Sequence, residues 1–258
     1  MLKTIFTCCL ILLASTSCAT PPALTLNTHD AMKIGQKIWH NEGIGKIENL
    51  TVWNKGEEFP SLGIGHFIWY PAGITGPFKE SFPQLIASLR QERTLPQWLL
   101  NTHQAPWSSR EHFYAEINTP RMNELRQLLQ ETVPQQTAFI VKRMEAALPK
   151  MVTSLGNEGQ RQHVERQFYR VANQPNGLYA LIDYVNFKGE GTSLTERYNN
   201  QGWGLLQVLE SMPGNGNAMV EFAQAADFVL TRRVQNAPRD ESRWLPGWRN
   251  RLKSYLPD

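Results

Sequence analysis

The sequence predicts an α+β protein that is dominated by helices and has one small β element in its first third. Two observations lead to this prediction. In most of the chain, apolar residues recur at helical spacing, in segments that prolines separate. From 48 to 66, in contrast, the sequence contains glycines and many β-branched and aromatic residues, which favours a hairpin or a small sheet.

The N-terminal segment is excluded from the fold because it has the pattern of an export signal. Residues 1–17 combine a positive start, a short apolar run and small residues at the end, which is typical of a secretory signal peptide. The cysteine that follows, Cys18, resembles the lipid-bearing cysteine of bacterial lipoproteins, and ordinary cleavage after residue 17 is the alternative. Ala19 resembles the sorting pattern for the outer membrane. We therefore expect a periplasmic protein anchored to that membrane through a lipid on Cys18, with 18–27 as a tether.

Composition limits the classes of function. The net charge of +3 is compatible with an anionic wall polymer and too small to indicate nucleic-acid binding. The three cysteines, Cys8, Cys9 and Cys18, all lie in the leader or at its edge, so the remaining chain depends on a hydrophobic core rather than on disulfides. The histidines show no metal-ligand spacing, and we expect neither a metal nor a cofactor. The sequence does not indicate an oligomeric state.

The first predicted helix runs from Thr28 to Asn41. Asn27 is a suitable N-cap, and Gly43 and Gly45 are expected to end the helix. Further helices are predicted over 83–90, 122–131, 136–148, 177–187, 201–211, 218–233 and 247–255.

Two observations indicate where these later helices end and which of them is buried. Pro134 and Pro149 are expected to separate helices. The segment 177–187 is apolar nearly all round, which indicates a helix buried in a domain core.

The most informative motif is Glu42-Gly43 at the end of the first helix, followed by Ser-Leu-Gly-Ile-Gly-His at 61–66. This pattern resembles the phage-type lysozymes (endolysins), in which a helix ends in Glu-Gly and a hairpin carries Thr-x-Gly-x-Gly-His. A looser resemblance covers 177–255, while 67–176 does not align. We expect a lysozyme-like fold over 28–258, with a helical body and a small hairpin beside a groove. By position, the matching residues are Glu42 for the acid, Ser61 for the threonine, and Gly63, Gly65 and His66 for the rest.

The resemblance implies a peptidoglycan glycan-strand hydrolase. Glycoside cleavage needs a carboxylic acid to protonate the leaving oxygen, and a second group across the sugar. Glu42 lies at the negative end of a helix dipole, which favours its protonated form. Ser61 is expected to hold the attacking water, and Gly63 and Gly65 to let a bulky polymer approach the strand. His66 is expected to be structural.

The second carboxylate departs from the family pattern. Lys55 occupies the position where the family carries an acid. Glu57 and Glu58 are the local substitutes, and in an extended segment Glu57 shares a face with Ser61. We therefore expect Glu57 to be the second carboxylate, with Glu58 and, less favoured, Glu48 as alternatives.

Aromatic residues flank the motif. Trp53, Trp69 and Tyr70 are candidates for stacking on the apolar faces of sugar rings, with core packing as the alternative. Trp98, Trp107 and Trp244 are interpreted as packing residues.

Three other functions stay open. A lytic transglycosylase uses one Glu and the sugar's own N-acetyl group, and leaves 1,6-anhydro ends. A catalytically inactive lysozyme-like lipoprotein would only bind the wall. A chitin- or chitosan-directed enzyme could use the same fold, because fold does not determine substrate.

Overall fold

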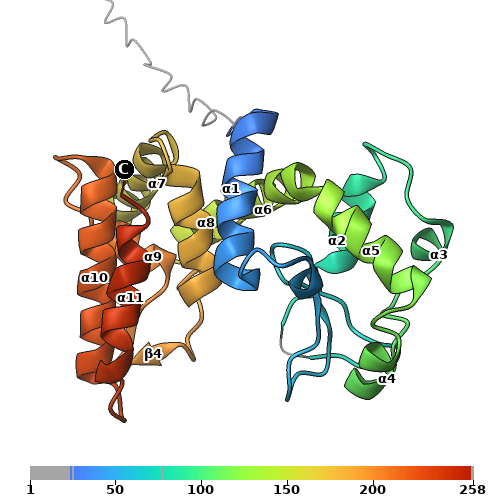
Figure 1. Cartoon of the computed structure of the whole chain (residues 1–258). Helices are drawn as coiled ribbons and strands as arrows, with labels where there is room; N and C mark the ends of the chain where they lie inside the picture. Colours follow the sequence, from blue (N-terminus) through green and yellow to red (C-terminus); the bar gives the residue numbers. More distant parts are fainter. Residues whose placement is uncertain (1–23, 25, 77, 257–258) are drawn as a thin grey trace, which may run out of the picture.

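The computed structural model describes residues 24, 26–76 and 78–256, and these form a mostly helical α+β protein (Figure 1). The predicted leader, Cys18 and most of the predicted tether lie outside the described residues. At the end of the tether, Leu24 and Leu26 pack against the hydrophobic core. The Leu24 N–H also donates to the Glu145 carboxylate at 2.6 Å, so this part of the tether is attached to the body.

The first helix, α1 (Thr28–Gly43), begins and ends close to the predicted residues. The Asn27 side chain accepts a hydrogen bond from the Asp30 N–H at 2.9 Å, which confirms the predicted N-cap. Ile44 and Gly45 both adopt left-handed backbone conformations, with φ of 54° and 65°, and these end the helix. Glu42 therefore lies in the last turn of α1.

The predicted β element is confirmed as a small sheet. After a 3₁₀ turn, η1 (Ile47–Leu50), three short strands form an antiparallel sheet in the order β1-β2-β3. In this sheet Ser61 pairs with Val52 on one side and with Ile68 on the other. Gly63 begins the turn between β2 and β3, and its N–H donates to the Leu50 carbonyl at 2.8 Å. The strands are β1 (Thr51–Val52), β2 (Ser61–Leu62) and β3 (Phe67–Ile68).

The longest helix, α6 (Val133–Thr153), packs against α1, α2, α7 and α8. Its predicted end before Pro149 was wrong, because the helix continues through this proline. Proline has no amide hydrogen, so the backbone carbonyl four residues before Pro149 has no helical donor. Pro149 is exposed, so this carbonyl lies on the solvent side of the helix. Pro134 lies in the first turn, where no amide hydrogen is required.

The other predicted helices are present, but the helix expected from 201 begins only at 205, because Gln201 and Gly202 form a short strand. Three further helices, α3, α4 and α7, were not predicted. The helix expected to be buried, α8, is buried at every residue from Gly177 to Tyr184, which confirms the prediction. The bounds are α2 (Phe82–Leu89), α3 (Gln97–Leu100), α4 (Arg110–Ala115), α5 (Pro120–Glu131), α7 (Glu158–Ala172), α8 (Gly177–Lys188), β4 (Arg197–Tyr198), β5 (Gln201–Gly202), α9 (Leu205–Ser211), α10 (Ala218–Asn236), η2 (Ser242–Trp244) and α11 (Leu245–Lys253).

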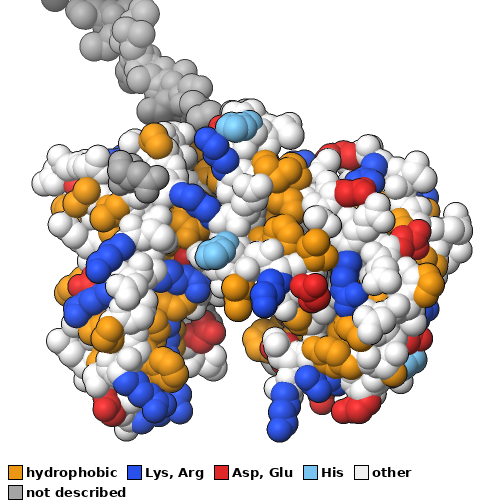
Figure 2. Space-filling view, in the orientation of Figure 1, with side chains coloured by type: hydrophobic (Ala, Val, Ile, Leu, Met, Phe, Trp, Pro, Cys, Tyr) orange, Lys and Arg blue, Asp and Glu red, His pale blue; other side chains and the backbone are white. Residues whose placement is uncertain are grey.

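The elements form two sides with α1 and α6 between them (Figure 1). Helices α7 to α11 lie on one side, and the three-stranded sheet with α2 to α5 lies on the other. A cleft opens between the C-terminal helices and the sheet, and α1 ends at the top of it (Figure 2). The segment 67–176 contributes β3 and α6 to the core and is therefore an integral part of the body. Among the described helices, none is both long and apolar enough to cross a membrane.

Candidate functional site

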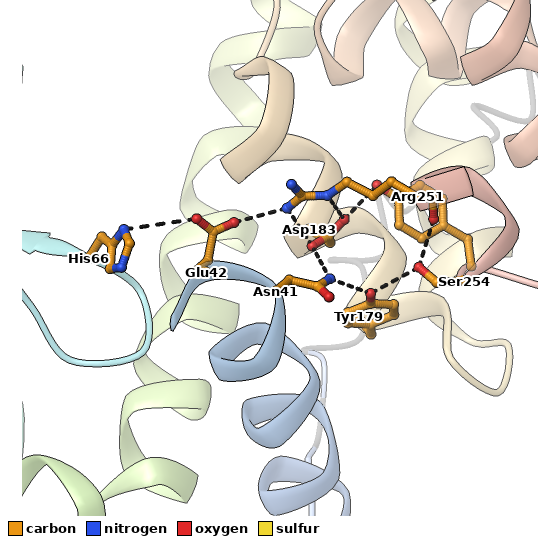
Figure 3. Close-up of polar contacts among 8 residues, drawn as sticks. Asn41, Glu42, His66, Tyr179, Asp183, Arg251 and Ser254 are labelled. Carbon is orange, nitrogen blue, oxygen red and sulfur yellow. Dashed lines mark hydrogen bonds and ion pairs between the residues drawn. The ribbon is translucent and has the colours of Figure 1, made fainter. Parts of the chain in front are cut away.

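The Glu42 side chain points into the space between the β2–β3 turn and the C-terminal helix α11 (Figure 3). Its Oε1 accepts a hydrogen bond from Arg251 Nη2 at 2.9 Å, and its Oε2 lies 3.9 Å from His66 Nδ1. The side chain is 23% exposed, so the carboxylate is partly shielded from water and still accessible. The expected family acid thus lies at the junction of three parts of the chain that are far apart in sequence.

Arg251 is shared between two carboxylates. Its Nε and Nη2 donate to the two oxygens of Asp183 at 2.7 and 2.8 Å, and Nη2 also donates to Glu42. Burial lowers the pKa of the Arg251 guanidinium, but the hydrogen bonds and charges of Asp183 and Glu42 outweigh it and raise that pKa above its ordinary value. The cluster therefore contains one permanent positive charge and two carboxyl groups, of which Asp183 is only 1% exposed.

A second layer of hydrogen bonds holds this cluster (Figure 3). Tyr255 Oη donates to Asp183 at 2.7 Å, and Asn41 Nδ2 donates to Asp183 at 2.9 Å and to Tyr179 Oη at 2.7 Å. Tyr179 Oη is in turn 3.0 Å from Ser254 Oγ. Burial and the neighbouring Asp183 charge raise the pKa of Tyr255, so its hydroxyl remains a donor. The end of α1, the middle of α8 and the end of α11 are thereby joined.

Sequence reasoning missed Asp183 and Tyr255, and included Arg251 only within a loosely matching segment. One signal was available for Asp183. It is the one charged residue within the apolar run 178–187, and a buried carboxylate requires a cationic or hydrogen-bonding partner. The identity of that partner could not be read from the sequence, because Arg251 lies 68 residues further along the chain.

On the sheet side, a buried amide positions the turn that carries His66. Gln136 on α6 is fully buried, and its Oε1 accepts from the Ile64 N–H at 3.0 Å. Its Nε2 donates to the Leu129 carbonyl at 2.6 Å and to Thr132 Oγ1 at 3.0 Å. Every polar atom of this amide is thus paired, and the β2–β3 turn is attached to α6.

The two glycines of the motif serve packing in this structure. Gly63 is buried with φ of 71°, and a Cβ there would lie 2.3 Å from Gln136 Oε1. Gly65 is partly exposed, and a Cβ there would lie 2.8 Å from the Phe67 ring and 3.0 Å from Ile140 Cδ1. The observed reason for Gly63 is therefore the Gln136 contact rather than access for a polymer, and Gly65 is required by its close contacts with Phe67 and Ile140.

The other expected catalytic residues do not contact Glu42. Glu57 lies at the tip of the β1–β2 hairpin, where its carboxylate accepts from Asn54 Nδ2 at 3.1 Å. Glu58 is exposed at the same tip. Ser61 is 4% exposed in the central strand. The structure thus brings Glu42 together with His66 and Arg251, while Glu57 and Ser61 keep their roles only as predictions.

The three aromatic residues expected to stack on sugars are core residues instead. Trp53, Trp69 and Tyr70 are 2%, 1% and 7% exposed. Trp69 packs on the Phe82 ring at 4.8 Å between centroids, and Tyr70 packs edge-to-face on Phe59 at 5.2 Å. With so little exposed area, none of these rings presents a free face to a ligand, because burial of aromatic surface in the core is more favourable.

An exposed ring occurs where only packing was expected. Trp244, in the 3₁₀ turn before α11, is 52% exposed, and the Arg243 guanidinium lies 4.8 Å from its ring centroid. The sequence around Trp244 does not distinguish it from the buried tryptophans, because each tryptophan lies in a segment of mixed polar and apolar residues.

Lys188 lies on the same side of the site as Arg251. Its Nζ is 4.0 Å from the Phe187 ring centroid and 3.6 Å from the Trp248 ring centroid, and Arg251 Cζ is 4.6 Å from the Phe187 centroid. Burial, assisted by the charge of Arg233, lowers the pKa of Lys188 to about 7. This amine therefore changes its charge near neutral pH.

Comparisons with known proteins do not assign the chain to a family. No protein-family model matches the chain, and no curated protein or solved structure matches it significantly. Within the residues that the structure describes, no group of three or more His, Cys, Asp or Glu side chains is arranged to hold a metal ion.

Proposed function

We propose that this protein is a lysozyme-like glycosidase that cleaves the glycan strands of peptidoglycan, with Glu42 as the general acid. The observation that supports this most is the position of Glu42. It is a partly exposed carboxyl group at the head of a cleft, held by Arg251 on one side and close to His66 on the other. The Glu-Gly and Gly-x-Gly-His resemblance supports the same assignment.

In the proposed reaction Glu42 donates a proton to the leaving oxygen of the glycosidic bond. Arg251 donates two hydrogen bonds to Asp183 and one to Glu42, so its guanidinium is shared between two carboxyl groups. Glu42 is the more exposed of the two and is the one that a substrate can reach. After the proton transfer, Arg251 stabilises the Glu42 carboxylate that remains.

The group that acts on the opposite face of the sugar is proposed to be Glu57, with Ser61 holding the water. Glu57 lies at the hairpin tip, where it bonds to Asn54 and does not contact Glu42. This position also supports a second candidate, a lytic transglycosylase that uses Glu42 alone. Glu57→Gln and Glu58→Gln separate the two candidates. In a hydrolase with Glu57 as second carboxylate, only Glu57→Gln abolishes turnover. In a transglycosylase both variants keep turnover, and the products carry 1,6-anhydro ends.

The location of the enzyme is part of the same proposal. An export signal over 1–17 and a lipid on Cys18 would place the protein in the periplasm on the outer membrane, where peptidoglycan is within reach. Lipid attachment is tested by mass spectrometry of the protein isolated from membranes, beside Cys18→Ser. A mass increase that persists in Cys18→Ser would contradict this assignment.

The enzyme proposal is tested by digestion of purified peptidoglycan with the protein lacking residues 1–17. Glu42→Gln is the active-site variant, and Glu92→Gln is the matched control because Glu92 is exposed just beyond the end of α2. We expect soluble muropeptides from the parent and from Glu92→Gln, and a rate about 10² to 10⁴ times lower for Glu42→Gln. Folded protein that sediments with the wall and releases nothing in any form would contradict the proposal and indicate a binding module.

A further inference from the structure

Five non-glycine residues of the described chain have a left-handed backbone conformation, and two of them adjoin Glu42. Those two are Ile44, which follows Glu42 by two residues and has φ of 54°, and His66, which faces the Glu42 carboxylate and has φ of 46°. The other three are asparagines, a residue type that tolerates this conformation: Asn176, Asn199 and Asn200. In the described chain, left-handed backbone at residues other than glycine and asparagine is therefore confined to the surroundings of the proposed acid.

Ile44 is the less favourable of these two residues. Histidine enters the left-handed region more readily than a β-branched residue, in which two substituents on Cβ crowd the backbone. Glycine is the usual residue at such a helix end. The chain has a glycine one residue earlier, but Gly43 is buried inside the helix, where a Cβ would lie 3.0 Å from Trp39 Cδ1. The chain thus has isoleucine at the position where glycine would relieve the strain.

Packing does not explain Ile44 either. Its side chain is 69% exposed, and of the large apolar side chains that the structure describes only Leu194 is more exposed. Among the described residues that form the core or pack against it, Ile44 does not occur. A residue with an unfavourable backbone conformation and almost no burial weakens the fold, and such positions are found mainly at functional sites.

The position of Ile44 in the cleft indicates what its side chain can contact. Ile44 follows the last turn of α1, which ends at the top of the cleft (Figure 2). The Cα atoms of residues two apart are separated by at most about 7 Å, so Ile44 is close enough to Glu42 for one ligand to contact both. Gly43 and Gly45, on either side of it, have no side chains that would obstruct a ligand. Ile44 therefore presents an exposed apolar surface next to the proposed acid.

We propose that Ile44 contacts the substrate directly, by packing against the apolar C–H face of a sugar ring next to the bond that is cleaved. The inference rests on the proposed function, because it adds a residue that contacts the glycan to the cleft of Glu42. Burial of the Ile44 side chain by the sugar stabilises the complex and offsets the cost of its backbone conformation. Removal of this side chain should therefore have opposite effects on stability and on binding.

The first test measures stability in the protein lacking residues 1–17. Ile44→Gly and Ile44→Asn introduce residues that accept the left-handed conformation, and we expect the melting temperature to rise by about 2 to 4 °C in both. Val220→Asn is the matched control, because Val220 is also exposed and β-branched but lies in the first turn of α10. The control should show no rise. A lower melting temperature in both Ile44 variants would overturn the inference, because it would make Ile44 a structural residue.

The second test measures binding without turnover. Each substitution is combined with Glu42→Gln, and cosedimentation with purified peptidoglycan gives the affinity. We expect Ile44→Gly and Ile44→Asn to bind about tenfold more weakly than Glu42→Gln alone, because the apolar contact is lost. Ile44→Leu keeps an apolar side chain and should bind within about threefold, and Val220→Asn should leave the affinity unchanged. Unchanged affinity in both Ile44→Gly and Ile44→Asn, or no binding by Glu42→Gln itself, would overturn the inference.

The same measurement with glycan strands freed of their stem peptides identifies the part of the wall that Ile44 contacts. An equal loss of affinity on intact wall and on free strands is expected for a contact with the sugar. A loss that occurs only with the intact wall would assign the contact to the peptide and overturn the inference.

The two proposals fail separately. Higher stability and weaker binding in the Ile44 variants, without release of muropeptides by the parent, would retain the Ile44 contact and exclude the enzyme. Release that is lost in Glu42→Gln, together with unchanged affinity in the Ile44 variants, would retain the enzyme and exclude the contact.

Discussion

The two sides of Glu42 are held by different kinds of interaction. On the side of α8 and α11, a charged network with Asp183, Arg251 and Tyr255 is completed by hydrogen bonds of 2.7 to 2.9 Å. On the sheet side, His66 lies 3.9 Å away, and the turn that carries it is attached to α6 by the neutral amide of Gln136.

This difference indicates a division of roles. On the charged side, Asp183 and Tyr255 are buried, and most hydrogen bonds are made among the residues of the network. This side therefore determines where the Glu42 carboxyl group lies and how much of the Arg251 charge acts on it. Among the described residues, the sheet side gives the other carboxyl oxygen no short hydrogen bond, so in the proposed reaction that oxygen would face the glycosidic oxygen. The two sides should therefore respond differently to substitution.

The largest difference is expected between Asp183→Ala and Glu57→Ala. Asp183→Ala leaves the Arg251 charge without its buried partner and removes the acceptor of Tyr255 and Asn41. We expect the free energy of unfolding to fall by about 3 to 5 kcal/mol. Glu57→Ala at the hairpin tip should change it by no more than about 0.5 kcal/mol. Urea unfolding of both variants measures the two changes in the free energy of unfolding. Similar changes in the two variants would contradict the division of roles between the two sides of Glu42.

A smaller loss is expected on the sheet side from Gln136→Leu. This change leaves the Ile64 N–H and the Leu129 carbonyl without their buried partner. We expect a loss of about 1 to 3 kcal/mol and faster amide exchange at Ile64. Gln135→Leu is the control, because the buried Gln135 Oε1 makes no hydrogen bond to the described protein atoms. If Gln135→Leu has the larger effect, Gln136 is not the residue that holds the turn.

The predictions from sequence succeeded where local chemistry decides the structure. The Asn27 cap, the end of α1 near Gly43 and the buried character of α8 each depend on a few neighbouring residues. The position of Glu42 in the last turn of α1 followed from them.

The predictions failed where distant contacts decide. The aromatic residues Trp53, Trp69 and Tyr70 are buried because α2, α4 and the segment before α4 cover the sheet, and no local pattern shows this. Arg251 and Asp183 meet only because α11, which packs on α10, brings Arg251 within hydrogen-bond distance of α8 and of the end of α1. The strongest functional feature of the site thus depends on tertiary packing rather than on the motif.

A smaller effect with a defined pH dependence is expected on the charged side at Lys188. The groups that act on this amine are Arg233, Glu241 and Arg251, and burial lowers its pKa from 10.5 to about 7. Between pH 7 and 10.5 the unfolded chain binds a proton that the folded chain does not, so the contribution of Lys188 to stability rises with pH through this window. Below pH 7 both states are protonated and the folded state carries the full burial cost.

Lys188→Met removes this cost. We expect a gain of about 1 kcal/mol at pH 6, seen as a melting temperature about 2 to 4 °C higher, which disappears as the pH approaches 10.5. Lys142→Met, at an exposed position of α6, is the control and should show no such trend. A gain that grows with pH would contradict the sign of this prediction.

The most direct test of Glu42 as the acid is muropeptide release by the parent protein beside Glu42→Gln and Asp183→Asn. Asp183→Asn keeps the shape of Asp183 but removes the charge that holds Arg251 in place beside Glu42. We expect release by the parent, a rate about 10² to 10⁴ times lower for Glu42→Gln, and a rate about 10 to 10² times lower for Asp183→Asn. Release by Glu42→Gln at the rate of the parent would contradict Glu42 as the acid, and no release by the parent would contradict the enzyme itself.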